Sequence, residues 1–310
     1  MRNRLLLFFL IFLVFLGPLI GSPSFQFQWP IQPQKQKHVI TSTFGESRMD
    51  HFHNGMDISG EDLPVLPITD GKILYFEHSR MFPSSKRFLS GTGEQIWLEH
   101  EHGIWSGYYH LKEIYFPTDN FTFRRFDVLG ISGNTGKSSS AHLHFFITEE
   151  YGKKIINPLL RLPPEEDTTT PVIEHIAFII IKDEKEEISI ILPEKKANIK
   201  LTLPRPIYLK VYDANNVPKT KRIPYRIEWT FQNQKSQESS FYQFDFIENH
   251  PKGYLLNGNL SFEEVFYKNY VKLKTFPYEE GENLLTIKAI DKNNNTTEKK
   301  FLLWIKKEYE

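Results

Sequence analysis

The chain has 310 residues, of which 40% are hydrophobic and 25% charged, and its Lys plus Arg and Asp plus Glu counts are both 38. This balance is typical of a globular protein of one to three domains, and it lacks the basic excess of a nucleic-acid-binding protein. Cysteine is absent, which excludes disulfides, cysteine-ligated metal and thiol nucleophiles. The 26 Phe and 14 Tyr residues favour strands over helices.

Residues 1–24 are predicted to be an export signal. Arg2 and Arg4 give a positive start, an apolar stretch of 16 residues runs from Leu5 to Ile20, and small residues follow it. Because a membrane-spanning helix needs about 20 apolar residues, a cleaved signal is favoured over a retained anchor. We therefore expect an exported protein, in the periplasm, the cell envelope or the medium, that contacts the membrane only through this segment.

The next two segments are a lead-in and a first domain. Residues 25–38 are rich in Pro and Gln without a period, which indicates an extended lead-in. Between residues 39 and 162, short apolar runs alternate with turn residues, and none has the length and 3.6-residue period of a helix. This pattern predicts a mostly antiparallel β domain. Two long loops, around 79–93 and 112–126, are expected to act as lids or groove walls.

The first stretch with site chemistry is His53-Asn54-Gly55-Met56-Asp57, which spaces an imidazole and a carboxylate four residues apart. On a helix this spacing would put both side chains on one face, but the Asn-Gly pair indicates a turn that leads into a short strand. The second stretch, His142-Leu143-His144-Phe145, continues with strand-forming residues and is predicted to be a strand.

Strand geometry separates the two histidines of the second stretch in function. Because side chains alternate between the faces of a strand, His142 and His144 lie on one face, about 6.5 Å apart. That separation is too large for both to bind one zinc at about 2.1 Å without distortion. It suits one ligand next to one residue that contacts the metal's water. A histidine on another predicted strand, His110, completes the group, although a single His-x-His pair is more often structural than functional.

Six motifs follow one another between residues 38 and 160. They are Phe44-Gly45-Glu46-Ser47-Arg48, His53-x-Gly55-x-Asp57, Asp70-Gly71-Lys72-Ile73, Tyr109-His110-Leu111, the turn from Gly130 to Gly136, and His142-Leu143-His144-Phe145. Together they resemble the lysostaphin/LytM-type zinc endopeptidases, in the order in which that family carries them. The resemblance covers about 40% of the chain and implies a β-sheet peptidase domain with one Zn²⁺.

The resemblance also implies a role for each site residue. In that family the first His, the Asp and the second His of His-x-His bind zinc, whereas the isolated His and the first His of His-x-His flank the bound water. The residues so implied are His53, Asp57 and His144 as zinc ligands, with His110 and His142 as catalytic residues. The family's spacing favours His53 over His51, because only His53 has the Gly and the Asp at the required positions. Phe146 stands where many members carry Glu.

The rest of the chain is predicted to be a linker and a second β domain. Residues 163–171 combine prolines, threonines and acidic residues, which indicates a stiff polar spacer. Residues 172–310 repeat strand-like runs, and Ala289-Ile290-Asp291 with its Asn-rich turn looks like the end of many bacterial immunoglobulin-like modules. We expect an immunoglobulin-like β-sandwich with a binding or spacing role. Its two histidines, His175 and His250, have no partner at a ligand spacing.

The predicted protein is therefore mostly β, with an antiparallel zinc peptidase domain followed by a β-sandwich. The family implies hydrolysis of peptide bonds in peptidoglycan cross-links or stems, by a water that Zn²⁺ activates at its open fourth position. Two alternatives stay open. One is a catalytically silent module that binds cell wall or activates another cell-wall hydrolase. The other is a structural zinc site, which normally has four protein ligands and favours Cys.

Overall fold

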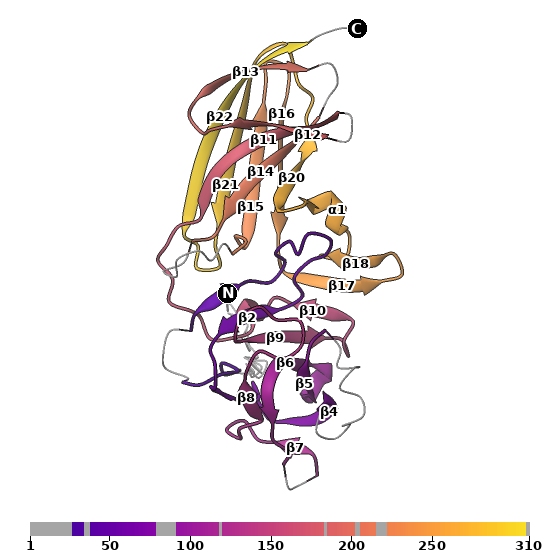
Figure 1. Cartoon of the computed structure of the whole chain (residues 1–310). Helices are drawn as coiled ribbons and strands as arrows, with labels where there is room; N and C mark the ends of the chain where they lie inside the picture. The colour runs from indigo at the N-terminus through magenta and orange to yellow at the C-terminus, as the bar shows by residue number, and fades with distance from the viewer. Residues whose placement is uncertain are drawn as a thin grey trace, which may run out of the picture.

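The computed structural model describes residues 27–33, 38–78, 91–117, 120–182, 185–201, 205–214 and 222–307 (Figure 1). The predicted export signal at 1–24 lies outside these residues, and the predicted lead-in at 25–38 is described only in part. Within the described ranges, no helix combines the length and the apolar character that crossing a bilayer requires.

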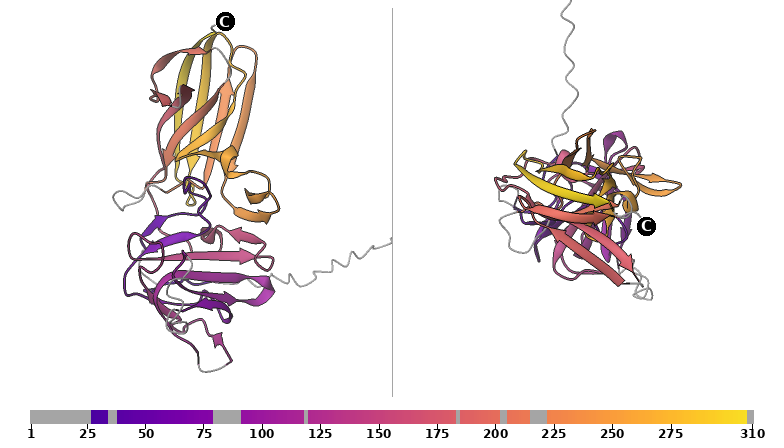
Figure 2. Two further views of the ribbon diagram at one scale, coloured as in Figure 1. Left: turned by 45° about the vertical axis from the view of Figure 1, so that its right-hand side comes forward. Right: turned by 90° about the horizontal axis from the view of Figure 1, so that it is seen from above.

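The protein is almost entirely antiparallel β, with 55% strand and 4% helix, which confirms the predicted fold class. Figures 1 and 2 show two bodies stacked end to end, an indigo-to-magenta body formed mainly by the earlier part of the chain and a rose-to-yellow one formed by the later part. The predicted division into two domains, with a linker between residues 162 and 172, stays a prediction. Strands from both sides of this linker share one sheet, so the two bodies do not coincide fully with the two halves of the chain.

A twelve-stranded sheet forms the body that carries the candidate site. Its main path, from edge to edge, is β18 (Gly253–Leu256), β17 (Phe246–His250), β10 (Lys154–Ile156), β9 (His142–Glu149), β6 (Trp105–Ile114), β5 (Glu94–Glu99), β4 (Gly71–Glu77) and β7 (Thr122–Phe123). The strands beside this path are β1 (Ile40–Ser42), β2 (Met56–Ser59), β3 (Pro64–Val65) and β8 (Gly130–Ser132). A short 3₁₀ turn, η2 (Glu101–Gly103), connects β5 and β6, and a second, η3 (Pro158–Leu160), follows β10.

Alternation along β9 fixes which side chains enter the core of this sheet. Leu143, Phe145 and Ile147 are fully buried in one hydrophobic cluster, which also contains Ile58 of β2 and Tyr108 of β6. Burying each such side chain contributes about 1.5–3 kcal/mol. The residues between them therefore project to the opposite face, and this places both histidines of β9 on the side away from the core.

Two five-stranded sheets form the second body, and Figure 2 shows them as two layers. One has the order β12 (Lys185–Ile191), β11 (Val172–Lys182), β14 (Pro206–Tyr212), β20 (Tyr270–Thr275) and β19 (Phe266–Tyr267). The other has the order β13 (Lys196–Leu201), β22 (Thr296–Lys307), β21 (Gly281–Ile290), β15 (Arg226–Gln232) and β16 (Gln237–Gln243). A single helical turn, α1 (Phe262–Val265), precedes β19. A common core that includes Trp229 and Phe301 lies between the layers, and the immunoglobulin-type assignment stays a prediction.

The two bodies are joined by contacts that the sequence did not reveal. Strand β17 pairs with β10, with Ile247 opposite Ile155, so that the hairpin β17–β18 extends the site-bearing sheet. In return, Phe44 and Phe52 belong to the hydrophobic cluster of the second body, where the Phe52 ring packs edge-on against Phe262. The loop that precedes the candidate site is therefore held on its far side by the carboxy-terminal part.

Candidate metal centre

Register between β2 and β9 brings the first two site residues together. Asp57 lies directly opposite His144 in this antiparallel pair, and opposite residues project from the same face of a sheet. His53 precedes β2 in a turn. At Gly55 a Cβ atom would lie 2.6 Å from the Phe145 carbonyl oxygen and 2.8 Å from the His144 ring. The turn can approach β9 this closely only because residue 55 has no side chain.

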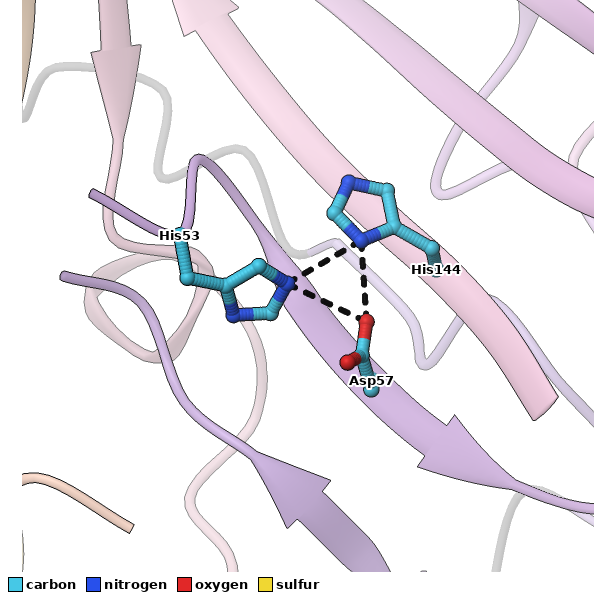
Figure 3. Close-up of side chains that lie close together, drawn as sticks. All are labelled: His53, Asp57 and His144. Carbon is cyan, nitrogen blue, oxygen red and sulfur yellow. Dashed lines mark hydrogen bonds and ion pairs between the residues drawn. The ribbon is translucent and has the colours of Figure 1, made fainter. Parts of the chain in front are cut away.

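The three predicted ligands converge on one point (Figure 3). His53 Nε2 lies 3.1 Å from His144 Nδ1 and 3.2 Å from Asp57 Oδ1, and His144 Nδ1 lies 2.9 Å from the same oxygen. All three residues are buried, at 4–8% exposure. The structure thus places two imidazole nitrogens and one carboxylate oxygen at the corners of a small triangle.

Hydrogen bonds behind His53 and Asp57 set their orientation. His53 Nδ1 donates to the Thr43 carbonyl at 2.8 Å, which leaves the lone pair on Nε2 directed at the triangle. The second oxygen of Asp57 accepts from Arg48 Nη2 at 2.7 Å, and the same nitrogen donates to Ser42 Oγ at 2.7 Å. These partners fix the His53 tautomer and the rotation of the carboxylate.

A buried carboxylate organises this supporting layer. Glu46 accepts hydrogen bonds from Ser42 Oγ and from the Thr43 backbone N–H, both at 2.6 Å. Burial raises the pKa of Glu46 to about 7, against the effect of those hydrogen bonds. The sequence placed Glu46 and Arg48 in a motif but did not assign them a role. Their position just before the metal-type residues was the available sign that they support the site.

The two predicted catalytic histidines lie beside the triangle. Their ring centroids are 4.8 Å apart, and His142 Nε2 is 3.8 Å from Asp57 Oδ1. Each Nδ1 donates to a backbone carbonyl at 2.8 Å, that of Thr135 for His110 and that of Ser140 for His142. In the neutral form of each ring, the other nitrogen, Nε2, therefore carries the lone pair. His110 has a φ of 63°, a left-handed conformation that is uncommon for a residue with a side chain.

Burial sets the protonation of these groups. It lowers the pKa of both His144 and His110 to about 4, so both rings are neutral at pH 7. Burial alone would raise the pKa of Asp57, but its electrostatic interaction with His53 and its contact with His144 hold that pKa well below the usual range. An ionised carboxylate next to a neutral imidazole is the state in which these side chains bind metal.

The donor set fits a single metal ion. Ligand atoms bound at about 2.1 Å in a tetrahedral site are about 3.4 Å from one another, and the three observed separations are only slightly shorter. Three protein ligands leave a position open, as in catalytic zinc sites, whereas structural sites are normally closed by four. His51 is not part of the triangle; its ring is largely exposed and lies 2.6 Å from Asp50 Oδ1.

An open groove of about 590 Å³ gives access to the centre. Tyr109 forms part of its wall and stacks on His144, with ring centroids 5.2 Å apart and planes at 18°. Arg48 and Lys137 are the cationic side chains among its lining residues, and Ser138, Ser139 and Ser140 follow Lys137 along the wall. Because Arg48 is paired with Asp57, Lys137 gives this wall of the groove its positive charge.

Comparisons with known proteins agree with this geometry. Residues 51–158 match the model of peptidase family M23, and a second family model without a description matches residues 172–306. An "Uncharacterized metalloprotease" of Buchnera aphidicola is 32% identical over 133 residues, which are 41% of this chain and 32% of that protein. The chain thus spans about a third of the length of this curated relative.

Two solved structures are each similar to part of the chain. A zinc-containing peptidase from Vibrio cholerae is 25% identical, with 39% of this chain and 36% of that chain covered and a TM-score of 0.32. The catalytic domain of the antimicrobial peptidase lysostaphin from Staphylococcus simulans is 24% identical, with 36% and 80% covered and a TM-score of 0.30.

Proposed function

Because residues 51–158 are a domain of peptidase family M23, we propose that the protein is a zinc metalloendopeptidase that hydrolyses peptide bonds in peptidoglycan. The observation that carries the proposal is the convergence of His53, Asp57 and His144 in an open groove, with two further imidazoles alongside. The family resemblance supplies the substrate class. The metalloprotease name of the Buchnera aphidicola relative supports the metal-dependent chemistry.

The three convergent residues would hold one Zn²⁺ through His53 Nε2, Asp57 Oδ1 and His144 Nδ1. Bound there, the ion would polarise the scissile carbonyl and make a water nucleophilic near neutral pH. Asp57 is the one negatively charged ligand of the ion, and its ion pair with Arg48 reduces the negative charge that it contributes to the metal centre. The neutral His144 imidazole adds no negative charge, which keeps the centre electrophilic.

His110 and His142 move the proton in the proposed reaction. His110 is neutral at pH 7 and its Nδ1 is fixed by the Thr135 carbonyl, so its Nε2 can accept a proton from the attacking water. The protonated His110 can then pass this proton to the leaving amine. His142, whose Nδ1 is held in the same way by the Ser140 carbonyl, can donate a hydrogen bond to the developing oxyanion once its Nε2 has taken up a proton. A positioned proton carrier of this kind contributes about 10²–10⁴ in rate.

The groove chemistry agrees with an anionic peptide substrate. Stem peptides of peptidoglycan carry free carboxylates, and the Lys137 ammonium lies on the groove wall where it can pair with one. The adjacent serines can donate hydrogen bonds to the peptide backbone. We also propose that the protein acts outside the cytoplasm, because its substrate lies there and residues 1–24 have the pattern of an export signal. Amino-terminal sequencing of the protein recovered from the cell envelope tests the export.

Zinc analysis combined with digestion of purified peptidoglycan sacculi tests the function. The proposal predicts about one zinc per chain and release of peptides from sacculi, both lost in Asp57→Ala. A protein that binds zinc and sacculi but releases nothing would instead be the silent binding module. A protein whose zinc is retained without binding or cleavage of sacculi would have a structural site.

A further inference from the structure

A second group of buried carboxylates lies at the junction of the two bodies. Asp167 belongs to the predicted linker, Asp213 follows β14 and Asp291 follows β21. These residues are 3–7% exposed, and one oxygen of each lies within 4.8 Å of the others. The three carboxylates come from segments far apart in the sequence, so the fold itself creates the cluster.

Among the residues that the structure describes, Arg222 is the one cation in ion-pair contact with this cluster, and Lys292, whose ammonium lies over the Tyr225 ring, also lines the cavity. Arg222 contacts Asp167 Oδ2 at 2.5 Å, Asp213 Oδ2 at 2.9 Å and Glu165 Oε1 at 2.6 Å. A single guanidinium therefore faces four carboxylates when Asp291 is included. Buried charges are stable only when they are paired, and this cluster lacks positive charge.

One oxygen in the cluster has no donor. Within the described part of the chain, no hydrogen-bond donor reaches Asp213 Oδ1, which is fully buried. Asp213 lines a cavity of about 20 Å³ together with Asp167 and Asp291. A space of this size accommodates one water or one ion. A proton would neutralise one carboxylate, whereas a divalent cation in the cavity, together with Arg222, would compensate all three.

The protonation behaviour of the cluster agrees with missing positive charge. Burial raises the pKa of Asp213 to about 8, and the charges of Asp291 and Asp167 add to the rise although Arg222 opposes it. Burial also raises the pKa of Asp291. Hydrogen bonds from Thr169 and the charge of Arg222 instead lower the pKa of Asp167, against the effect of burial. In the protein alone, the ionised forms of Asp213 and Asp291 are therefore costly, and a bound cation would remove that cost.

We propose that Asp167, Asp213 and Asp291 bind a divalent cation, and that this cation is Ca²⁺. All donors are carboxylate oxygens, which favour a hard cation over zinc. Ca²⁺ accepts irregular sets of 6–8 oxygens at about 2.3–2.6 Å, whereas Mg²⁺ demands near-octahedral geometry and keeps several waters, for which a 20 Å³ cavity has no room. This site is separate from the His-Asp-His centre and does not rest on the proposed peptidase activity.

The cavity lies next to the loop that supports the candidate metal centre, so a bound cation would affect that loop. The same cavity is lined by Thr43 and Phe44, and Thr43 Oγ1 accepts a hydrogen bond from the Ile223 backbone N–H, next to Arg222. The Thr43 carbonyl in turn holds the metal ligand His53. Bound Ca²⁺ would fasten the linker and two turns of the second body immediately beside the loop that supports the candidate metal centre.

Ca²⁺ titration of the zinc-loaded full-length protein tests the site, with thermal unfolding and Tb³⁺ luminescence as readouts. Tyr225 lines the cavity and can sensitise a Tb³⁺ ion bound in place of Ca²⁺. We expect Ca²⁺ to raise the melting temperature by about 2–4 °C, to displace Tb³⁺, and to bind with a Kd of about 10⁻⁴–10⁻³ M, typical of extracellular calcium sites. Mg²⁺ at the same concentration should neither raise the melting temperature nor displace Tb³⁺.

Two variants separate this site from the candidate metal centre. Asp213→Asn should lose at least tenfold in Ca²⁺ affinity and keep its zinc, whereas Asp57→Asn should lose zinc and keep the Ca²⁺ response. If wild type shows neither a thermal shift nor Tb³⁺ luminescence at about 10 mM Ca²⁺ or saturating Tb³⁺, far above the expected Kd, the proposal is wrong and the cluster is a proton-balanced ion-pair network. Because this outcome is read on wild type, it stands even if Asp213→Asn does not fold.

Discussion

His142 and His144 project from the same face of β9 but meet different partners. His144 Nδ1 lies 2.9 Å from Asp57 Oδ1 and 3.1 Å from His53 Nε2, inside the triangle. His142 approaches that oxygen only to 3.8 Å and is tied by Nδ1 to the Ser140 carbonyl. The geometry supports the assignment of His144 to the metal and of His142 to proton transfer, as the family resemblance implies.

Alanine substitutions at these two positions should therefore have different effects. His144→Ala removes one of three ligands, so we expect loss of both zinc and activity. His142→Ala should retain zinc and lose about 10²–10⁴ in turnover, and His110→Ala should behave in the same way. Zinc content and turnover of a cell-wall peptide, measured on the same three proteins, check this. Loss of zinc in His142→Ala alone would reverse the assignment.

Glu46 is expected to affect metal affinity without touching the metal. It orients Ser42 and Thr43, and Thr43 holds the His53 ring. Supporting residues of this kind are worth about 10–100-fold in metal affinity, so Glu46→Ala should lose that much. Competition with a chelating dye measures the loss, with circular dichroism to confirm the fold. Asp50→Ala, an exposed change on the same loop, is the control, and equal affinities in both variants would contradict the role of Glu46.

At the scale of elements, local patterns predicted strands but not their distant partners. The apolar alternation in β9 and the turn before β2 were readable because both depend on neighbours in the sequence. The pairing of β10 with β17 was not, because its two strands are about ninety residues apart and neither differs in composition from an ordinary edge strand. For the same reason, the composition of the predicted linker concealed that Asp167 is buried against Arg222.

The site shows the same division between local and distant information. The five residues predicted to bind metal or transfer protons were identified from motif order, since each lies in a short stretch with a recognisable spacing. The supporting contacts of Ser42, Glu46 and Arg48 were not, because they depend on how the loop after β1 folds back over β2. A hydrophobic anchor holds this loop from outside, with Phe44 and Phe52 in the core of the second body.

A fragment of residues 25–162 should bind zinc but be less stable than the same part of the full chain. It retains all five site residues, yet it exposes Phe44 and Phe52 and leaves the edge of β10 unpaired. Each phenylalanine contributes about 1.5–3 kcal/mol when buried. Thermal unfolding and zinc analysis of the fragment check this, with Phe52→Ala in the full chain as the matched change. A folded fragment without zinc would show that the centre requires the second body.

For the whole molecule, the carboxylate cluster predicts how stability depends on pH. The folded-state pKa of Asp213, about 8, lies above the usual value near 3.9 of an unfolded Asp. The folded state therefore holds a proton that the unfolded state releases. Stability should fall as pH rises from about 4 to about 8, by at most about 1.4 kcal/mol per pH unit.

Denaturant unfolding at several pH values between about 5 and 8, without and with Ca²⁺, measures this dependence. Saturating Ca²⁺ should reduce the slope because the cation takes the place of the proton. Asp213→Asn should reduce it under both conditions because the titrating group is gone. An unchanged slope in the variant would assign the dependence to other groups.

The central claim, a zinc-dependent peptidase acting on peptidoglycan peptides, is tested most directly by mass analysis of what the protein releases from purified sacculi. The zinc-loaded protein should release fragments with new amino and carboxyl ends at peptide bonds, and Asp57→Ala should release none. Release of fragments cut only in the glycan strands, or no release by folded protein with a full complement of zinc, would contradict the claim.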